Sequence, residues 1–274
     1  MKQHLIVLDL DGTLLTDEKV ITEKTEQTLK AAREAGHQVM IATGRPYRAS
    51  EPYYRQLDLE VPIVNFNGAF VHHPKDRSWK TFHEPISLPV VSDVVEALQD
   101  FSVHNVVAEV MDDVYIHRHD EKLLNIFTMG DPSVTIGDLR SYLNDNPTSL
   151  LIHPELEDQE NIRRHLAEVH AEVIDHRRWG APWHVIEVIR HGLNKAVGIS
   201  KVSEWLNIPQ ERIIAFGDED NDYEMIEYAG TGVAMGNAIN GLKSIADEVT
   251  GTNNEDGIAT VLEERLNLKL ESKI

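Results

Sequence analysis

Short apolar runs alternate with amphipathic stretches near the start of the chain. The run 4–10 (HLIVLDL) is too short for a helix, is rich in Val, Ile and Leu, and precedes turn-forming residues, so it predicts a buried strand. Between Thr22 and Ala35, apolar and small residues recur at helical spacing, and Gly36 follows where a helix commonly ends. The runs 37–42 and 61–66 predict further strands. This strand–helix–strand order is typical of a parallel sheet covered on both faces.

The segment 84–189 has a different pattern. Pro89 begins a predicted helix, and the runs 106–110 and 114–117 are separated by a short turn, which predicts an antiparallel hairpin. Further elements are expected at 149–153 (strand), 161–170 (helix), 172–174 (strand) and 184–189 (strand). Together they indicate an α+β domain with its own core.

The first pattern resumes after this segment. The predicted elements are a helix at 194–205, a strand at 212–216, a helix at 222–228, a strand at 231–234 and a helix at 238–246. The chain is therefore predicted to have an α/β fold, with a doubly wound, mainly parallel sheet built from 1–83 and 190–274. The α+β domain at 84–189 is inserted into it.

Length and composition exclude several classes of protein. A chain of 274 residues with 41% hydrophobic residues can form one or two real cores, and the absence of cysteine excludes disulfide scaffolds and thiolate metal sites. No apolar stretch reaches the roughly 18 residues of a membrane span, and the first residues do not resemble a signal peptide. We therefore expect a cytoplasmic protein without a membrane partner.

The net charge is strongly negative. The chain has 26 Lys and Arg residues against 46 Asp and Glu residues, a balance of −20, and the segment 84–189 alone holds 20 acidic and 7 basic residues. Such a charge repels polyanions, so nucleic-acid binding is disfavoured. An anionic substrate would need a locally positive site rather than long-range attraction.

Two aspartates interrupt the apolar end of the first strand. Asp9 and Asp11 lie at its carboxyl end, where α/β sheets bind their ligands, and Gly12 and Thr13 follow. An Asp-Gly pair alone is common in ordinary turns. Two acids within an otherwise apolar strand end favour chemistry instead.

Weaker signals lie at other element ends. Thr43 and Gly44 follow the second strand, where a hydroxyl and a backbone amide can bind a small anion or merely cap a helix. Lys195 begins a helix just after the insertion, although most lysines are simply solvated. The segment 217–222 (GDEDND) follows another strand; its carboxylates suit Mg²⁺, or else form a solvated acidic loop. Together with the two aspartates of the first strand, it predicts a metal site.

Other patterns carry less weight. The glycines at 230–236 have neither the spacing nor the position of a dinucleotide-binding loop, and the 14 histidines show no zinc-binding spacing. Trp179 and Trp183 are expected in a core or an interface, or else on the face of the inserted domain over the site.

The four strand-end and helix-start motifs, in this order, resemble those of the haloacid dehalogenase superfamily of phosphotransferases over the whole chain. The position of the insertion and the segments 67–69 (NGA), 232–238 (GVAMGNA) and 256–259 (DGIA) are similar to Cof-type phosphatases with a C2-type cap. The resemblance implies a Rossmann-like core and a cap that sets substrate specificity. The family often has Gly after the motif lysine, whereas this chain has Ala196.

The resemblance also implies roles for the motif residues. Asp9 is expected to be the nucleophile and Asp11 the general acid/base. The expected phosphate-binding residues are Leu10, Thr43, Gly44, Lys195 and Asn221. The expected Mg²⁺ ligands are Asp9, Asp11 through its backbone carbonyl, Asp218 and Asp222.

These features predict a Mg²⁺-dependent phosphatase of small phosphomonoesters, such as sugar phosphates or phosphorylated cofactors and their precursors, acting through an aspartyl-phosphate. Two alternatives share them: a sugar phosphomutase, and a non-catalytic module that is phosphorylated on aspartate and regulates a partner. Arg45 and Asn67, near the predicted junction with the cap, are candidates for substrate contact, or otherwise for helix capping and turn formation.

Overall fold

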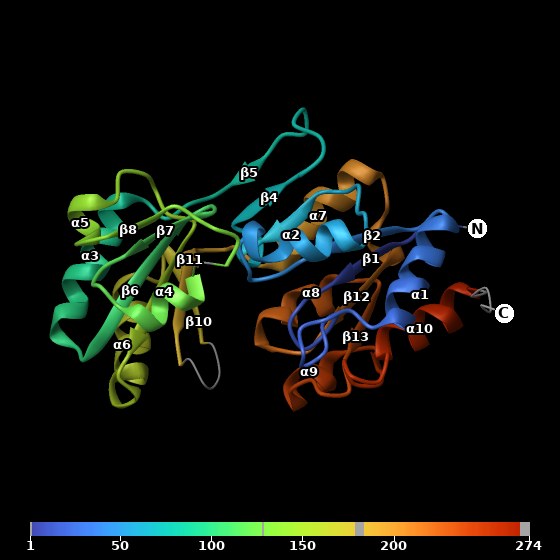
Figure 1. The fold of residues 1–274 in the computed structure, drawn as a ribbon. Helices are drawn as coiled ribbons and strands as arrows, with labels where there is room; N and C mark the ends of the chain where they lie inside the picture. The colour runs from blue at the N-terminus through green and yellow to red at the C-terminus, as the bar shows by residue number, and fades with distance from the viewer. Residues whose placement is uncertain (1, 128, 179–183, 269–274) are drawn as a thin grey trace. The chain divides into compact units, whose positions relative to one another are not determined.

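The computed structural model describes residues 2–127, 129–178 and 184–268 (Figure 1). The chain forms two compact units. The first comprises Met1–Gly44, Glu51–Thr81 and Asn194–Ile274, and the second comprises Arg45–Ser50 and Phe82–Leu193. No helix within the described ranges is long and apolar enough to cross a membrane. Trp179 and Trp183 lie outside the described residues.

The first unit contains a five-stranded sheet in which all neighbouring strands run parallel. The strand order is β14-β13-β12-β1-β2. The strands are β1 (Leu5–Leu8), β2 (Gln38–Ile41), β12 (Ile213–Gly217), β13 (Thr231–Ala234) and β14 (Glu248–Val249). All four residues of β1 are buried, as expected of a parallel strand whose two faces are both covered. The predicted doubly wound α/β fold is confirmed.

The predicted strand at 61–66 departs from this sheet. It forms β3 (Ile63–Asn65), which pairs antiparallel with β4 (Phe70–His72), and a single parallel bridge between Ala42 and Val64 connects it to the end of β2. The turn between β3 and β4 is the short helix η1 (Phe66–Gly68). This turn carries Asn67.

Helices cover the parallel sheet. They are α1 (Glu23–Glu34), α7 (Lys195–Leu206), α8 (Tyr223–Tyr228), α9 (Asn240–Ile245) and α10 (Gly257–Leu266), with the short helices η4 (Gln210–Arg212) and η5 (Asp220–Asp222). α1 begins after Thr22, whose Oγ1 accepts a hydrogen bond from the Thr25 backbone N–H. The sequence pattern did not predict α10 or α2 (Tyr47–Gln56). α2 was missed because Pro52 in its interior removes a helical hydrogen bond.

The second unit contains a six-stranded sheet of order β10-β11-β9-β6-β7-β8. Its strands are β6 (Val103–Val110), β7 (Asp113–Ile116), β8 (Val134–Ile136), β9 (Ser149–Pro154), β10 (Ile174–Arg178) and β11 (Ile186–Arg190), and this unit also holds β5 (Phe82–His83). All pairs within the six-stranded sheet are antiparallel except β7 with β8, so the predicted hairpin of β6 and β7 is confirmed. The helices are α3 (Leu88–Ala97), α4 (Glu121–Phe127), α5 (Leu139–Tyr142) and α6 (Gln159–Val169), with the short helices η2 (Leu98–Asp100) and η3 (Leu156–Asp158).

One predicted strand of this unit is wrong in position. The sequence pattern predicts a strand at 172–174, whereas β10 begins at Ile174 and continues to Arg178. β10 is an edge strand with the sequence IDHRR, so its polar residues do not form the apolar pattern that predicts a buried strand.

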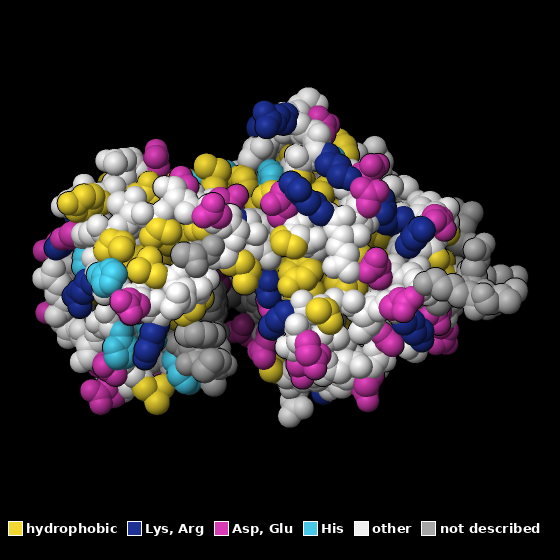
Figure 2. All heavy atoms as spheres, viewed as in Figure 1, with side chains coloured by type: hydrophobic (Ala, Val, Ile, Leu, Met, Phe, Trp, Pro, Cys, Tyr) yellow, Lys and Arg dark blue, Asp and Glu magenta, His cyan; other side chains and the backbone are white. Residues whose placement is uncertain are grey.

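Ten of the fourteen histidines belong to this unit, and Figure 2 shows histidine side chains on its surface.

Apolar clusters cover both faces of the six-stranded sheet. Val106, Ala108 and Val110 of β6 pack in one cluster with residues of α3 and α6, whereas Val107 packs in another with residues of α4. Alternate residues of a strand point to opposite faces, so β6 supplies both clusters. The segment 45–50 groups with this unit, although the sequence pattern predicts it to belong to the first domain. Its Arg48 forms a buried ion pair with Glu109 of β6.

Candidate active site

Two of the predicted aspartates lie at the carboxyl ends of neighbouring strands. Asp9 follows β1 and Asp218 follows β12, and these strands pair in parallel register. The backbone N–H of Asp9 donates to the Phe216 carbonyl at 3.2 Å, which extends the pairing to the start of the site. Both carboxylates are buried, with 6% and 7% of the residue exposed. The sheet therefore places two acids together that are far apart in the sequence.

Lys195 is the first residue of α7 and is fully buried. Asn194 caps this helix, because its side-chain oxygen accepts a hydrogen bond from the Val197 backbone N–H. Nζ of Lys195 lies 2.6 Å from Oδ1 of Asp9 and 2.6 Å from Oδ1 of Asp222. Burial by itself lowers the pKa of Lys195, but Asp222 and Asp9 raise it by more, so the ammonium stays charged.

Asp222 organises the loop after β12. Its Oδ2 accepts hydrogen bonds from the backbone N–H groups of Asp218 at 2.9 Å and Glu219 at 3.2 Å, while its Oδ1 accepts from Lys195. Both oxygens of this completely buried side chain are thus engaged by the protein. A Cβ on Gly217 would lie 2.6 Å from the Asp222 side chain, so glycine makes room for it. Asp222 therefore holds Lys195 and the loop after β12 in place, and it is also a potential metal ligand.

The carboxylates of Asp9, Asp218 and Asp222 form the one group of potential metal ligands found among the described residues, with ligand atoms within 4.8 Å of one another. Burial raises the pKa of Asp9 to about 7, against the effect of Lys195. Burial, with the nearby charges of Asp9 and Asp222, raises the pKa of Asp218 to about 8. A single ammonium balances only part of the negative charge of three buried carboxylates, so a further cation would stabilise the group. The donor atoms are all oxygen, which suits Mg²⁺. The residues present therefore fit the metal that the sequence predicts.

Gly12 and Thr13 shape the position of Asp218. A Cβ on Gly12, whose φ is +74°, would lie 2.2 Å from Oδ2 of Asp218, and Oγ1 of Thr13 donates to Oδ1 of Asp218 at 2.7 Å. Only glycine satisfies both the backbone conformation and the close approach. The sequence pattern predicted no role for either residue, although their position directly after two acids was a signal for one.

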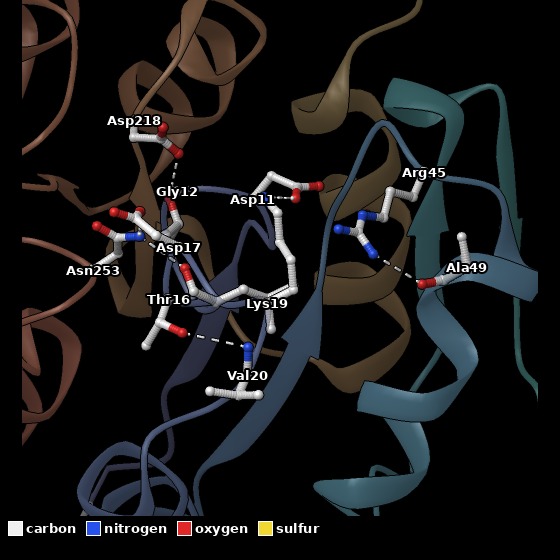
Figure 3. A network of polar contacts seen from close by, with 12 residues as sticks. Asp11, Gly12, Thr16, Asp17, Lys19, Val20, Arg45, Ala49, Asp218 and Asn253 are labelled. Carbon is white, nitrogen blue, oxygen red and sulfur yellow. Dashed lines mark hydrogen bonds and ion pairs between the residues drawn. The ribbon is translucent and has the colours of Figure 1, made fainter. Parts of the chain in front are cut away.

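The carboxylate of Asp11 lies outside this group of ligands. Its side chain is 44% exposed, and Oδ1 lies 2.8 Å from Nζ of Lys19 (Figure 3). No spacing rule in the sequence pointed to Lys19. The predicted contribution of Asp11 to metal binding through its backbone carbonyl stays a prediction.

Thr43, Gly44, Asn67 and Asn221 come together beside the acidic group. The backbone N–H of Asn67 donates to the Thr43 carbonyl at 3.1 Å, and Oδ1 of Asn67 accepts a hydrogen bond from Nδ2 of Asn221 at 3.0 Å. A Cβ on Gly44 would lie 3.1 Å from Nδ2 of Asn67. Asn67 is buried, and its backbone adopts a left-handed conformation with φ +50°. Through its contacts with Thr43 and Asn221, it joins two of the predicted phosphate-binding segments.

Two predicted residues have other surroundings. The carbonyl of Leu10, a buried residue, accepts hydrogen bonds from the backbone N–H groups of Thr13 and Leu15, which closes the turn after β1. Arg45 belongs to the second unit, and its Nη1 donates to the Ala49 carbonyl at 3.2 Å (Figure 3). Substrate contact by Arg45 stays a prediction.

Comparison with known proteins agrees with this geometry. The haloacid dehalogenase-like hydrolase family matches residues 6–262. The chain belongs to this family. It is 57% identical to the 5-amino-6-(5-phospho-D-ribitylamino)uracil phosphatase YitU of Bacillus subtilis, over 97% of this chain and 99% of the relative. It is 32% identical to the pyridoxal phosphate phosphatase YbhA of Escherichia coli, over 94% and 97% of the two chains.

Solved structures have the same fold. A haloacid dehalogenase-like hydrolase from Bacteroides thetaiotaomicron superimposes with a TM-score of 0.80 at 27% identity, covering 96% of this chain and 99% of the other. A protein from Thermotoga maritima gives a TM-score of 0.81 at 27% identity, covering 96% and 97%. With these matches, the chain is a phosphoric monoester hydrolase, as the sequence predicted.

Proposed function

We propose that this hydrolase cleaves small phosphomonoesters in a Mg²⁺-dependent reaction through an aspartyl-phosphate on Asp9. The observation that carries the proposal is the position of the Asp9 carboxylate. It is buried at a strand end, held 2.6 Å from the ammonium of Lys195, and grouped with Asp218 and Asp222. A nucleophile, a fixed cation and oxygen ligands for a second cation thus meet at one point.

Each residue of the site has a separate role in the proposed reaction. Oδ of Asp9 attacks phosphorus and forms an aspartyl-phosphate. Lys195 stabilises the negative charge on the phosphoryl oxygens, with the hydroxyl of Thr43 as a further donor. Asp11 protonates the leaving oxygen and then takes a proton from the water that hydrolyses the intermediate. Mg²⁺ held by Asp9, Asp218 and the Asp11 carbonyl would neutralise the carboxylates and polarise a phosphoryl oxygen.

The substrate that we propose is 5-amino-6-(5-phospho-D-ribitylamino)uracil, the compound named for the B. subtilis relative. Identity of 57% over 97% of the chain supports the same choice of substrate. The compound is a phosphomonoester on a ribityl chain, which agrees with the predicted class of sugar phosphates and cofactor precursors. The expected cytoplasmic location stays a prediction.

The test is phosphate release from a panel of phosphomonoesters with Mg²⁺, comparing the wild type with Asp9→Asn. We expect the wild type to release phosphate in large excess over enzyme, with the ribitylaminouracil compound preferred, and Asp9→Asn to be inactive but folded. Asp58→Asn, an exposed isosteric change in the same unit, is the matched control. Turnover by Asp9→Asn would contradict the mechanism.

The same assay separates the two alternatives considered from the sequence. A phosphomutase returns the phosphoryl group to its substrate, so it would not release phosphate in excess over enzyme. A regulatory module would form a long-lived phospho-aspartate without turnover. Preference for another phosphomonoester would contradict the proposed substrate and leave the mechanism intact.

A further inference from the structure

The turn 235–239, which follows β13, contacts two loops of the site. The backbone N–H of Ile239 donates to the Asp218 carbonyl at 2.9 Å. The side chain of Asn237 reaches the other loop, because its Nδ2 donates to the Gly12 carbonyl at 2.8 Å. These two hydrogen bonds join the loop after β12 to the loop after β1.

A second asparagine orients the side-chain amide of Asn237. The backbone N–H of Asn253 donates to Oδ1 of Asn237 at 3.0 Å, which leaves Nδ2 of Asn237 facing the Gly12 carbonyl. Asn253 is buried, and its own Nδ2 donates to the Leu15 carbonyl at 2.9 Å and to Oδ1 of Asp17 at 3.2 Å (Figure 3). Asn237 is exposed, yet both ends of its amide have a defined partner.

Gly12 is a position of this loop where an outside contact matters. Its φ of +74° and the 2.2 Å between an added Cβ and Oδ2 of Asp218 exclude a side chain there. Glycine also has the most backbone freedom of any residue, so other conformations of the loop stay accessible unless a neighbour restricts them. The hydrogen bond from Asn237 fixes the direction of the Gly12 carbonyl and removes part of this freedom.

We propose that Asn237 is a positioning residue for the Mg²⁺ site. It holds the loop that carries the Asp11 carbonyl in a fixed position relative to the loop that carries Asp218, so that both ligand oxygens are in place before the ion binds. Mg²⁺ demands a near-ideal octahedral set of oxygen ligands, so its binding is sensitive to a displacement of either loop. The inference rests on the proposed function, because it concerns the same proposed metal ligands.

The affinity for Mg²⁺ depends on how often the two loops have the arrangement that binds the ion. Without the amide of Asn237, only a fraction of the molecules would have it, and the apparent dissociation constant rises in inverse proportion to that fraction. The loss of one net hydrogen bond corresponds to a factor of about 3 to 10. Ca²⁺ accepts a more flexible set of oxygen ligands at longer distances, so the same displacement affects its binding less. The ratio of the Mg²⁺ and Ca²⁺ dissociation constants therefore reports positioning.

The experiment measures binding of Mg²⁺ and of Ca²⁺ to the full chain by isothermal titration calorimetry, without substrate. We expect Asn237→Ala to raise the dissociation constant of Mg²⁺ about 3- to 10-fold and that of Ca²⁺ less than about 2-fold. Asn237→Asp has the same size and keeps the acceptor for the Asn253 N–H, but it places an oxygen where the donor to Gly12 stood. Its added charge acts on both divalent ions alike, so the Mg²⁺ constant should again rise relative to the Ca²⁺ constant.

Asn254→Ala is the matched control. Asn254 is an exposed asparagine of the same unit that bonds to the same loop, because its Oδ1 accepts from the Asp17 N–H at 3.1 Å and its Nδ2 donates to the Asp17 carboxylate at 3.0 Å. We expect Asn254→Ala to lower Tm by a similar amount to Asn237→Ala and to leave the ratio of the two dissociation constants unchanged.

Activity gives a second readout. At saturating Mg²⁺, Asn237→Ala should recover most of the wild-type kcat, because excess ion selects the arrangement that binds it. An unchanged Mg²⁺ constant in both Asn237 variants, an equal rise for both ions, or the same change of ratio in Asn254→Ala would overturn the inference. If the wild type binds no Mg²⁺, the proposed function itself fails; if it binds Mg²⁺ and the Asn237 variants bind it equally well, only the inference fails.

Discussion

Nζ of Lys195 lies 2.6 Å from Oδ1 of Asp9, although 186 positions separate the two residues in the chain. Lys195 is the first residue of a capped helix, and Asp9 directly follows β1, a buried strand of the parallel sheet. A fully buried ammonium is tolerated because carboxylates compensate its charge. In the proposed reaction, this ammonium supplies a fixed positive charge for the phosphoryl group in a protein whose net charge is −20.

Removing this ammonium should affect both activity and stability. Lys195→Met leaves the buried carboxylates of Asp9 and Asp222 without their partner, so we expect loss of about 3–5 kcal/mol of unfolding free energy without metal. We expect kcat to fall by at least about 10²-fold, as for other fixed transition-state donors. Denaturant unfolding and phosphate release measure the two effects. Lys30→Met, at an exposed helix position, is the control and should change neither the free energy of unfolding nor kcat by much.

Gly12→Ala should damage the metal site rather than only strain the backbone. The added Cβ would lie 2.2 Å from Oδ2 of Asp218, so we expect weaker Mg²⁺ binding by isothermal titration and loss of activity. Gly36→Ala is a close control, because Gly36 also has positive φ but nothing within 4 Å of the new Cβ. It should cost about 1–2 kcal/mol of stability and leave activity intact. Equal Mg²⁺ affinity in Gly12→Ala and wild type would contradict this assignment.

Stabilisation by Mg²⁺ should depend on pH. Burial raises the pKa of Asp9 to about 7 and that of Asp218 to about 8, from an ordinary value of 3.8. At pH values between the ordinary and the raised pKa of each group, the folded state binds more protons than the unfolded state. Without metal, each group therefore lowers the free energy of unfolding as the pH rises, by at most about 1.4 kcal/mol per pH unit. Mg²⁺ binds the ionised carboxylates, so its binding offsets this loss of stability.

Thermal unfolding with and without Mg²⁺ checks the expectation. The increase in Tm on adding Mg²⁺ should be larger at pH 8 than at pH 6, because protons compete with the metal at the lower pH. Asp218→Asn removes one titrating ligand and should flatten the dependence. A shift in Tm that is the same at both pH values would argue against metal binding by these carboxylates.

The buried pair of Arg48 and Glu109 should stabilise the second unit. Both side chains are at least nine-tenths buried, and burial raises the pKa of Glu109 in spite of the Arg48 charge. Arg48→Met leaves the buried carboxylate without its charged partner, and we expect a loss of about 3–5 kcal/mol of unfolding free energy. The double change Arg48→Met with Glu109→Gln should lose less. If the two single changes add without coupling in denaturant unfolding, the pair is not stabilising.

Much of the fold could be predicted because local patterns encode it. The apolar run before Asp9 and the helical spacing after Thr22 predicted β1 and α1 closely, and β13 was predicted to the residue. Elements without such a pattern were missed or misplaced. α2 contains Pro52, and β10 is a polar edge strand, so packing rather than local sequence stabilises them.

The sequence by itself determined which side chains end the strands and begin the helices, because turn chemistry and apolar periodicity are local properties. It therefore pointed to Asp9, Asp11 and the acidic segment 217–222, whereas Thr43 and Lys195 were weaker signals that the resemblance to the haloacid dehalogenase superfamily made candidates. Only the tertiary structure decided how these groups pair. The parallel order of β1 and β12 places Asp9 beside Asp218, and both oxygens of Asp222 are used to hold Lys195 and a loop. Such pairings depend on which distant segments meet in space, and local sequence patterns do not record this.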